Sequence, residues 1–197
     1  MNILIFGGAF DPPHLGHQQI IEGVLNYRPG ESWLADELWL VPTGTHDFGK
    51  KMTSPQHRLK MLELIIAALS QDFQPRVKIN SSELEREGVN QTYDTLVELA
   101  KQYPQHQFSW VMGSDNLAKF HLWENYDNLM AQFKVYIYPR AGVELKPWYE
   151  PMTVLEKVKE MAVSSTQVKK NLKVKKSIAS LVLPTIQTYI QEHQLYQ

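Results

Sequence analysis

Short apolar segments alternate with amphipathic segments along the chain, and this alternation is what most limits the folds open to it. The apolar runs end at glycine or proline, and the intervening segments carry apolar residues at helical spacing. Alternating strands and helices indicate βαβ units, a parallel sheet and right-handed crossovers. We therefore expect an α/β protein, with strands predicted over 3–6, 37–41, 76–79, 107–112 and 133–138.

Helices are predicted over 16–27, 55–69, 92–102 and 184–193, a short basic helix ends near 172, and the segment 152–158 fits either a strand or a helix. The 197 residues contain no internal repeat and no long linker, so we expect a single domain spanning 1–197. Ligands bind at the carboxyl ends of parallel strands. The loops after Phe6, Val41, Met112 and Tyr138 are therefore the places to look for a site.

The composition excludes several classes of function. Cysteine is absent, which rules out disulfides, a thiolate nucleophile, iron–sulfur clusters and cysteine-ligated zinc. The 20 Lys and Arg against 21 Asp and Glu give a net charge of −1, so no nucleic-acid or membrane partner is expected. The apolar start is too short for a membrane span and lacks the basic region of a signal peptide, so a cytoplasmic location is expected.

The loop after the first predicted strand combines glycines, histidines and a helix start. Gly7 and Gly8 let backbone amides approach a bound group, and the helix opening at His17 directs free N–H groups toward an anion. His14 and His17 are three residues apart, so both rings can project from one side of the turn and donate to phosphate oxygens. The loop is therefore predicted to bind phosphate.

Two other interpretations of this loop stay open, and a third does not fit. The loop could be a structural turn with incidental histidines, or His14, His17 and Asp11 could hold zinc, although no supporting carboxylate pairing is evident. The dinucleotide-binding pattern G-x-G-x-x-G fails because no glycine follows Gly8 at the required offsets.

The second loop contains a partial phosphate-loop pattern. Residues 44–50 match its first part, but Lys51 stands where a Ser or Thr must bind magnesium, and the next helix begins only at Pro55. The plain interpretation is a solvated loop. The sharper one is that Lys50 or Lys51, together with Arg58 on the next helix, clamps a second phosphate.

A serine-rich turn, Ser164-Ser165-Thr166, precedes the short basic helix. Ordinary N-capping explains the serines, but lysines near a helix start oppose its dipole unless an anion is present. Phosphate binding is therefore predicted here. The lysines over 169–176 also fit a nucleic-acid patch, yet no aromatic residues are interleaved with them, and a solvated charged face is commoner.

Trp123 follows the predicted strand end at Gly113-Ser114-Asp115. A tryptophan is more often a core residue than a ligand platform. At the ligand edge of a sheet, however, its ring could stack on a flat heterocycle.

These motifs together resemble a known family. The string His14-Leu15-Gly16-His17 resembles the H-x-G-H signature of the nucleotidyltransferase superfamily, and residues 164–169 resemble its late I-S-S-T-x-I-R motif. With Thr92-Tyr93-Asp94-Thr95, Gly113-Ser114-Asp115, Trp123 and the ending Gln194-Leu195-Tyr196, the chain resembles bacterial nicotinate-nucleotide adenylyltransferases over essentially its whole length.

The resemblance implies a doubly wound, Rossmann-like sheet of the nucleotidyltransferase type, with a carboxyl-terminal part from about 164 to 197 completing the ATP site. It implies transfer of AMP from ATP to nicotinate mononucleotide, giving the dinucleotide and pyrophosphate, with Mg²⁺ held largely by water and ATP. The residues implied for ATP are Gly7, Gly8, Phe10, His14, His17, Gly113, Asp115, Ser164, Ser165, Thr166 and Lys169, of which His14, His17 and Lys169 are the catalytic ones. Those implied for the pyridine mononucleotide are Lys50, Lys51, Arg58, Thr92, Tyr93, Trp123 and Arg140.

Two departures from the family pattern bear on function. Lys169 replaces the family's final arginine, which keeps the charge but loses the bidentate grip on phosphate. The second loop resembles that of eukaryotic nicotinamide-mononucleotide enzymes, so a preference for the amide substrate is an alternative. Another acceptor, such as phosphopantetheine, and a catalytically silent nucleotide-binding regulator are further alternatives, and self-association into a homo-oligomer is left open.

Overall fold

The computed structural model describes residues 1–44, 52–86, 88–158 and 162–197. Six strands, all parallel, form one sheet in the order β3-β2-β1-β4-β5-β6. Chain order reverses between β1 and β4, which is the doubly wound arrangement with its ligand crevice at that switch point. The strands are β1 (Asn2–Gly8), β2 (Glu37–Pro42), β3 (Val77–Ile79), β4 (Gln107–Gly113), β5 (Lys134–Tyr138) and β6 (Thr153–Val154).

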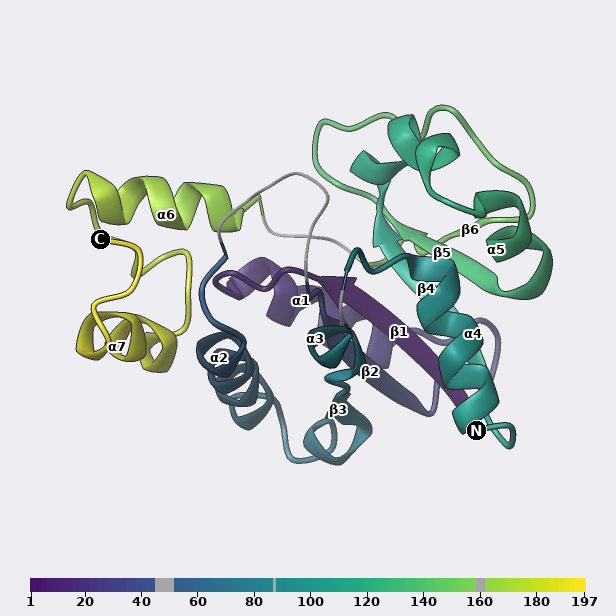
Figure 1. Ribbon diagram of the computed structural model, residues 1–197, viewed down its shortest axis with the longest axis horizontal. Coiled ribbons are helices and arrows are strands. Elements are labelled where there is room, and N and C mark those ends of the chain that lie inside the picture. Colours follow the sequence, from purple (N-terminus) through teal and green to yellow (C-terminus); the bar gives the residue numbers. More distant parts are fainter. Residues whose placement is uncertain (45–51, 87, 159–161) are drawn as a thin grey trace.

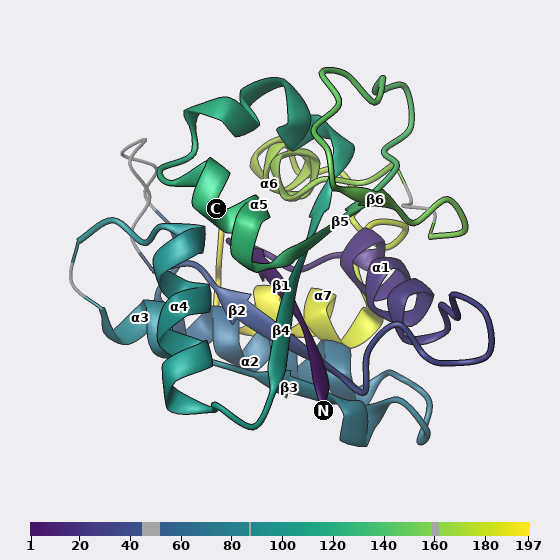
Figure 2. The ribbon, with the colours of Figure 1, turned by 90° about the vertical axis from the view of Figure 1, so that its right-hand side faces the viewer.

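Helices cover both faces of this sheet (Figures 1 and 2). One face carries α1, α2 and α7, and the other carries α4 and α5. The helices are α1 (Leu15–Leu25), α2 (Pro55–Ala67), η1 (Gln74–Arg76), α3 (Ser82–Glu85), α4 (Thr92–Gln102), η2 (Ser114–Leu122), α5 (Tyr126–Gln132), α6 (Ser165–Lys173) and α7 (Pro184–Glu192).

The central strand β1 separates two hydrophobic clusters. Leu4 and Phe6 point into the cluster beneath α1, α2 and α7, whereas Ile3 and Ile5 point into the cluster beneath α4 and α5. All four side chains are at most 4% exposed. A strand covered on both faces needs apolar residues at every position, which explains why β1 has a continuous apolar run rather than an alternating pattern.

The predicted strands and helices are present, and their boundaries differ from the predicted ones by at most two residues. The ambiguous segment 152–158 contains the short edge strand β6. The elements η1, α3, η2 and α5 were not predicted. Within η2 the buried residues Leu117 and Phe120 are three apart, which suits a 3-10 turn and gives no α-helical repeat, and α3 is only four residues long.

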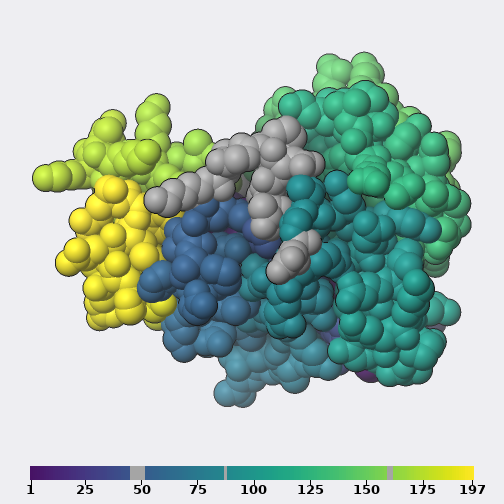
Figure 3. Space-filling view, viewed as in Figure 1, coloured from purple at the N-terminus to yellow at the C-terminus, as the bar shows by residue number. Residues whose placement is uncertain are grey.

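The carboxyl-terminal part packs against the rest of the fold. Val168 of α6 and Ile186 and Ile190 of α7 are at most 1% exposed and belong to the same cluster as β1. The space-filling view shows this segment, in yellow and yellow-green, lying against the blue surface of α2 (Figure 3). Among the described residues, no helix has the length and apolar character needed to cross a membrane.

Candidate active site at the carboxyl edge of the sheet

Two histidine rings lie side by side at the switch point, after the loop that follows β1. His14 is the N-cap of α1 and His17 lies in its first turn, and their ring centroids are 3.8 Å apart. The backbone N–H of His14 donates to Nδ1 of His17 over 3.1 Å. Because Nδ1 of His17 accepts this bond, its neutral ring carries the proton on Nε2, which leaves an N–H donor for a ligand.

Both imidazoles are held neutral. Burial, and secondarily the charge of Arg140, lowers the pKa of His14 to about 4. Burial also lowers the pKa of His17 well below its ordinary value, with further contributions from His14 and Arg140. Nδ1 of His14 is buried and has no hydrogen-bond partner in this structure. A buried polar atom without a partner calls for an explanation, and a ligand that binds beside the Nε2–H of His17 would provide one.

The structure gives Gly7 and Phe10 a packing role. A Cβ on Gly7 would lie 2.2 Å from the ring of Trp110, so the glycine makes room for that ring. Phe10 is 1% exposed and its ring packs 5.0 Å from that of His17 and 5.5 Å from that of Phe6. Its side chain is thus part of the core and supports the His17 ring from behind, so only its backbone can line the loop.

Asp11 is the hub that joins the first loop to the carboxyl-terminal part. Its side chain is buried, and its carboxylate accepts hydrogen bonds from Nζ of Lys169, from the hydroxyl of Tyr196 over 2.6 Å, and from the backbone N–H of Thr53 over 3.4 Å. Burial alone would raise the pKa of Asp11, but these donors lower it overall. The carboxylate therefore stays ionised and fixes Lys169 at the histidine loop.

The serine-rich turn directs the start of α6 toward the same loop. The hydroxyl of Ser165 donates to the carbonyl of Pro12 over 2.9 Å, which places the first turn of α6 beside the residues that precede His14. Ser164 is the N-cap and accepts from the N–H of Gln167 over 3.2 Å, whereas Thr166 is exposed. The N-termini of α1 and α6 are thereby brought to one place, where both favour an anion.

The ends of β4 and β5 border this place. A Cβ on Gly113 would lie 2.5 Å from Oδ1 of Asp115 and 2.9 Å from Cδ of Arg140, so these three residues are in close contact. Arg140 donates to Asp115 over 2.7 Å, and its charge acts on both imidazoles. Arg140 is thus tied to Asp115 and lies near enough for its charge to lower the pKa of both histidines.

Arg58 occupies a different environment from the anion clamp predicted for it. Its side chain is 1% exposed, and its guanidinium donates to the carbonyls of Ala9, Thr43 and Thr53 over 2.8–3.2 Å. These bonds tie α2 to the loops that follow β1 and β2, so in this structure Arg58 holds loops together. Lys50 and Lys51, which were predicted to form the clamp with Arg58, lie outside the described residues.

The residues expected to meet the pyridine gather around α4 and η2. Thr92 begins α4, and the hydroxyl of Tyr93 accepts from Gln132 over 2.7 Å. Trp123 is partly buried, with its ring 5.3 Å from that of Phe120. The second loop starts nearby. A Cβ on Gly44 would lie 2.1 Å from the carbonyl oxygen of Glu83, and the Glu83 side chain accepts a hydrogen bond from Thr95 of α4.

Sequence reasoning missed the hub role of Asp11, which it considered only as a zinc ligand, and gave no role to Tyr196. No group of three His, Asp or Glu side chains suited to a metal is found in the described parts of the chain. The sequence signal that could have found the hub role is an aspartate three residues before His14, inside the loop predicted to bind phosphate. Its partners at 169 and 196 could not be read, because nothing local links them to residue 11.

A doubly wound parallel sheet, paired neutral histidines at its switch point and a second helix N-terminus facing them define an α/β protein of the nucleotidyltransferase type. Residues 5–171 match the cytidylyltransferase-like family. The chain belongs to this family and, within it, to the group named nicotinate-nucleotide adenylyltransferases, as the following relatives show.

The probable nicotinate-nucleotide adenylyltransferase of Oceanobacillus iheyensis is 35% identical over 98% of this chain and 95% of its own length. The corresponding protein of Bacillus anthracis is 34% identical over 98% and 97%. The structure of the Plasmodium falciparum nicotinic acid mononucleotide adenylyltransferase complexed with NaAD superimposes with a TM-score of 0.83. It covers 99% of this chain and 97% of that one at 23% identity, which shows a shared fold.

Proposed function

We propose that the chain transfers the adenylyl group of ATP to nicotinate mononucleotide, giving nicotinate adenine dinucleotide and pyrophosphate. The group of relatives to which it belongs carries this activity in its name. The observation that carries the proposal is the adjacent, neutral pair His14 and His17. The start of α6 adjoins their loop, because Ser165 bonds to Pro12 and Lys169 to Asp11.

The reaction is an in-line displacement at the α-phosphorus of ATP. An oxygen of the mononucleotide phosphate forms the new bond to that phosphorus, and the bond to the oxygen that bridges to the β-phosphate breaks. The acceptor phosphate is already ionised at neutral pH, so the enzyme needs no nucleophile and no general base. Its contribution is to position the two substrates and to stabilise charge that develops on the departing pyrophosphate.

Each group at the crevice has a part in that task. Neutral His17 donates from Nε2 to a phosphate oxygen, and His14 donates beside it. Lys169 and the first turn of α6, with Ser165 and Thr166, contact the outer phosphates from the opposite side. In this proposal Gly113 and Asp115 meet the adenosine and the backbone at Gly8 lines the loop, while Ser164 caps α6.

The pyridine end is assigned by position. Backbone groups at Thr92 and Tyr93 would recognise the substituent on the ring, and Trp123 would cover the ring itself. Lys50 and Lys51 are retained as ligands of the mononucleotide phosphate. The charge of Arg140 acts on both histidines, so we assign Arg140 to the phosphates between the two nucleotides rather than to the acceptor alone.

The donor set of the crevice suits Mg²⁺ that arrives with ATP. Asp11 is engaged by Lys169 and Tyr196, and Asp115 by Arg140, so the described carboxylates form no cage of their own. When bound together with ATP, Mg²⁺ would supply neutralisation of the phosphate charge, and this chain's own residues would hold it through the nucleotide. We also propose that the protein is cytoplasmic and has no nucleic-acid partner. Analytical sedimentation would measure its oligomeric state.

Pyrophosphate release, measured with ATP and either nicotinate or nicotinamide mononucleotide, tests the proposal. We expect product with nicotinate mononucleotide and a lower kcat/KM with the amide. Phosphopantetheine serves as the acceptor control and should give no product. ATP binding without release for any acceptor would contradict the proposal and favour a nucleotide-binding regulator.

A further inference from the structure

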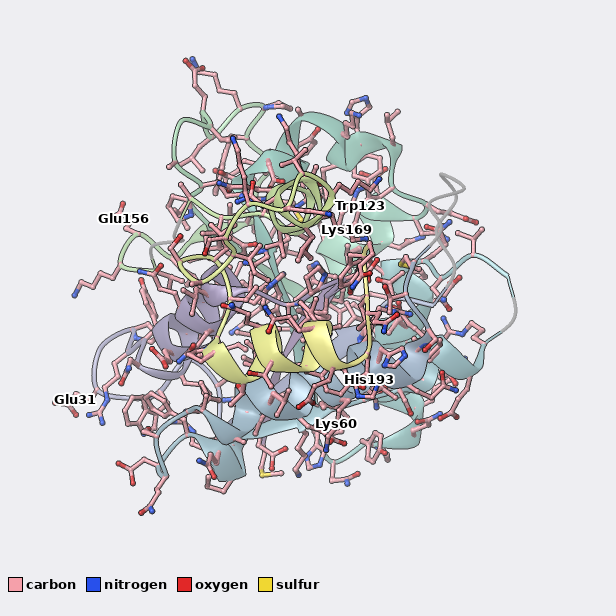
Figure 4. All side chains as sticks on the ribbon, turned by 90° about the vertical axis from the view of Figure 1, so that its left-hand side faces the viewer. Glu31, Lys60, Trp123, Glu156, Lys169 and His193 are labelled. Carbon is pink, nitrogen blue, oxygen red and sulfur yellow. The ribbon has the colours of Figure 1, made fainter. Side chains whose placement is uncertain are left out.

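The last residues of the chain fold back onto the nucleotide site. After α7 ends at Glu192, Gln194 and Tyr196 adopt left-handed φ angles of 51° and 64°, and Leu195 donates to the carbonyl of Ile190 over 3.0 Å. This conformation costs free energy for any residue with a Cβ. The tail thereby returns from α7 to α6 (Figures 1 and 4), and it delivers the Tyr196 hydroxyl to Asp11 over 2.6 Å.

Tyr196 contacts both members of the ion pair formed by Asp11 and Lys169. Its hydroxyl donates to Oδ1 of Asp11, while Nζ of Lys169 donates to Oδ2 and lies 5.2 Å from the centre of the Tyr196 ring. Burial, together with Asp11, raises the pKa of Tyr196, so the phenol keeps its proton. The donor direction is thereby fixed, and each Asp11 oxygen has one side-chain donor.

A lysine needs such support more than an arginine does. Its ammonium is a point charge on a flexible stem, without the planar fork that pre-organises an arginine against phosphate. Lys169 is one-third exposed, so solvent competes for it, whereas Asp11 is 3% exposed. A carboxylate held in one orientation gives the ammonium a fixed resting place at the mouth of the histidine loop.

We infer that Tyr196 is a positioning residue of the ATP site: by donating to Asp11 it orients the carboxylate that places Lys169 for the outer phosphates. This inference rests on the proposed function and adds a residue to it. Tyr196 does not touch substrate. Its effect is transmitted through two side chains, and it therefore bears on ATP affinity rather than on the pyridine substrate.

Tyr196→Phe removes only the hydroxyl, and the same terminal segment offers a matched control. Tyr189 of α7 donates or accepts through its hydroxyl at 2.8 Å from Nδ1 of His57 on α2, away from Asp11. Figure 4 shows this side of the molecule, with His193 and Lys60 on the opposite side of α7 from Lys169. Tyr189→Phe therefore removes a phenol hydroxyl that is bonded but lies outside the site.

We expect Tyr196→Phe to raise KM for ATP and its calorimetric Kd about tenfold, the loss of one hydrogen bond to a charged group. KM for nicotinate mononucleotide should stay within about twofold, and Tyr189→Phe should change neither. Thermal unfolding of the variants sets an assay temperature at which all are folded. Equal effects of the two substitutions, or an unchanged KM for ATP in Tyr196→Phe, would overturn the inference.

A double-mutant cycle separates positioning from general support of the fold. Lys169→Met removes the group through which Tyr196 acts, so adding Tyr196→Phe should not weaken ATP binding further. Additive losses would show that Tyr196 acts by another route. Wild-type protein that binds ATP but forms no dinucleotide would refute the proposed function alone, because the calorimetric cycle still tests the role of Tyr196.

Discussion

His17 shows how a single residue can serve both the fold and the reaction. Its Nδ1 accepts from the backbone of His14, and this bond fixes the tautomer that presents Nε2–H to a ligand. Burial lowers the pKa of His17 and keeps the ring uncharged, so in the proposed reaction His17 contributes a directed N–H donor rather than a positive charge. In the proposed reaction Lys169 supplies the positive charge, so the directed donor and the charge come from two different residues.

We predict that His17→Ala lowers kcat about 100-fold, as expected for the loss of one donor to developing charge, with little change in KM for the mononucleotide. Steady-state kinetics with each substrate varied would measure this split. His17→Gln is the matched control, because its amide can place an N–H near the position of Nε2. It should recover part of the loss, and an unchanged kcat in His17→Ala would remove His17 from the mechanism.

The lowered histidine pKa values also predict how stability depends on pH. An unfolded histidine binds a proton near pH 6.5, whereas folded His14 does so only near pH 4. The unfolded state therefore holds more protons between these values, and the free energy of unfolding decreases as the pH falls through this window. His14 alone should account for roughly 2 kcal/mol between pH 7 and pH 5.

Urea unfolding at pH 7 and pH 5 checks this prediction. His14→Gln cannot titrate, so its stability should fall less over the same interval than that of the wild type. Parallel losses in the two proteins would show that other groups carry the pH dependence.

Among the elements, α2 carries a residue whose contacts differ from those predicted for it. Its residue Arg58 was expected at a phosphate, but it binds three carbonyls in the loops after β1 and β2. The helix thereby holds those loops in place beside the crevice. An arginine on a predicted helix face gives no sign of which partner it will find, because backbone carbonyls and phosphates both attract a guanidinium.

Arg58→Met should reduce the free energy of unfolding by roughly 3 kcal/mol, since three loop carbonyls lose the buried guanidinium that donates to them. Chemical denaturation would measure the change. Lys60→Met on the same helix removes an exposed cation that pairs with exposed Glu63, and it should leave stability nearly unchanged. Similar losses in both variants would contradict the role given to Arg58.

The helices and strands with strong periodicity could be predicted from sequence, and Thr92–Gln102 was placed without error. The phosphate loop could also be located, because Gly7 to His17 combines a strand end with a helix start. The sequence could not show that Gly7 makes room for Trp110 or that Tyr196 reaches Asp11. Both depend on residues more than 100 positions away, which no local pattern encodes.

At the scale of the whole molecule, the carboxyl-terminal part is integral to the fold. Buried residues of α6 and α7 belong to the cluster that covers one face of the sheet. We predict that a chain ending at Val163 loses cooperative thermal unfolding and is rapidly cleaved by protease, because this removal exposes that face. Circular dichroism and limited proteolysis would measure both. A stable fragment of residues 1–163 would mean that the segment is a separable appendage.

The central place of β1 has a consequence for the order of folding. β1 pairs with β2 on one edge, but its other edge pairs with β4, whose first residue is Gln107. During synthesis, therefore, the strand that bears the phosphate loop presents an open edge and an uncovered apolar face until more than half of the chain has left the ribosome. Such long-range pairing slows folding, so this strand is where a nascent chain would most need a chaperone.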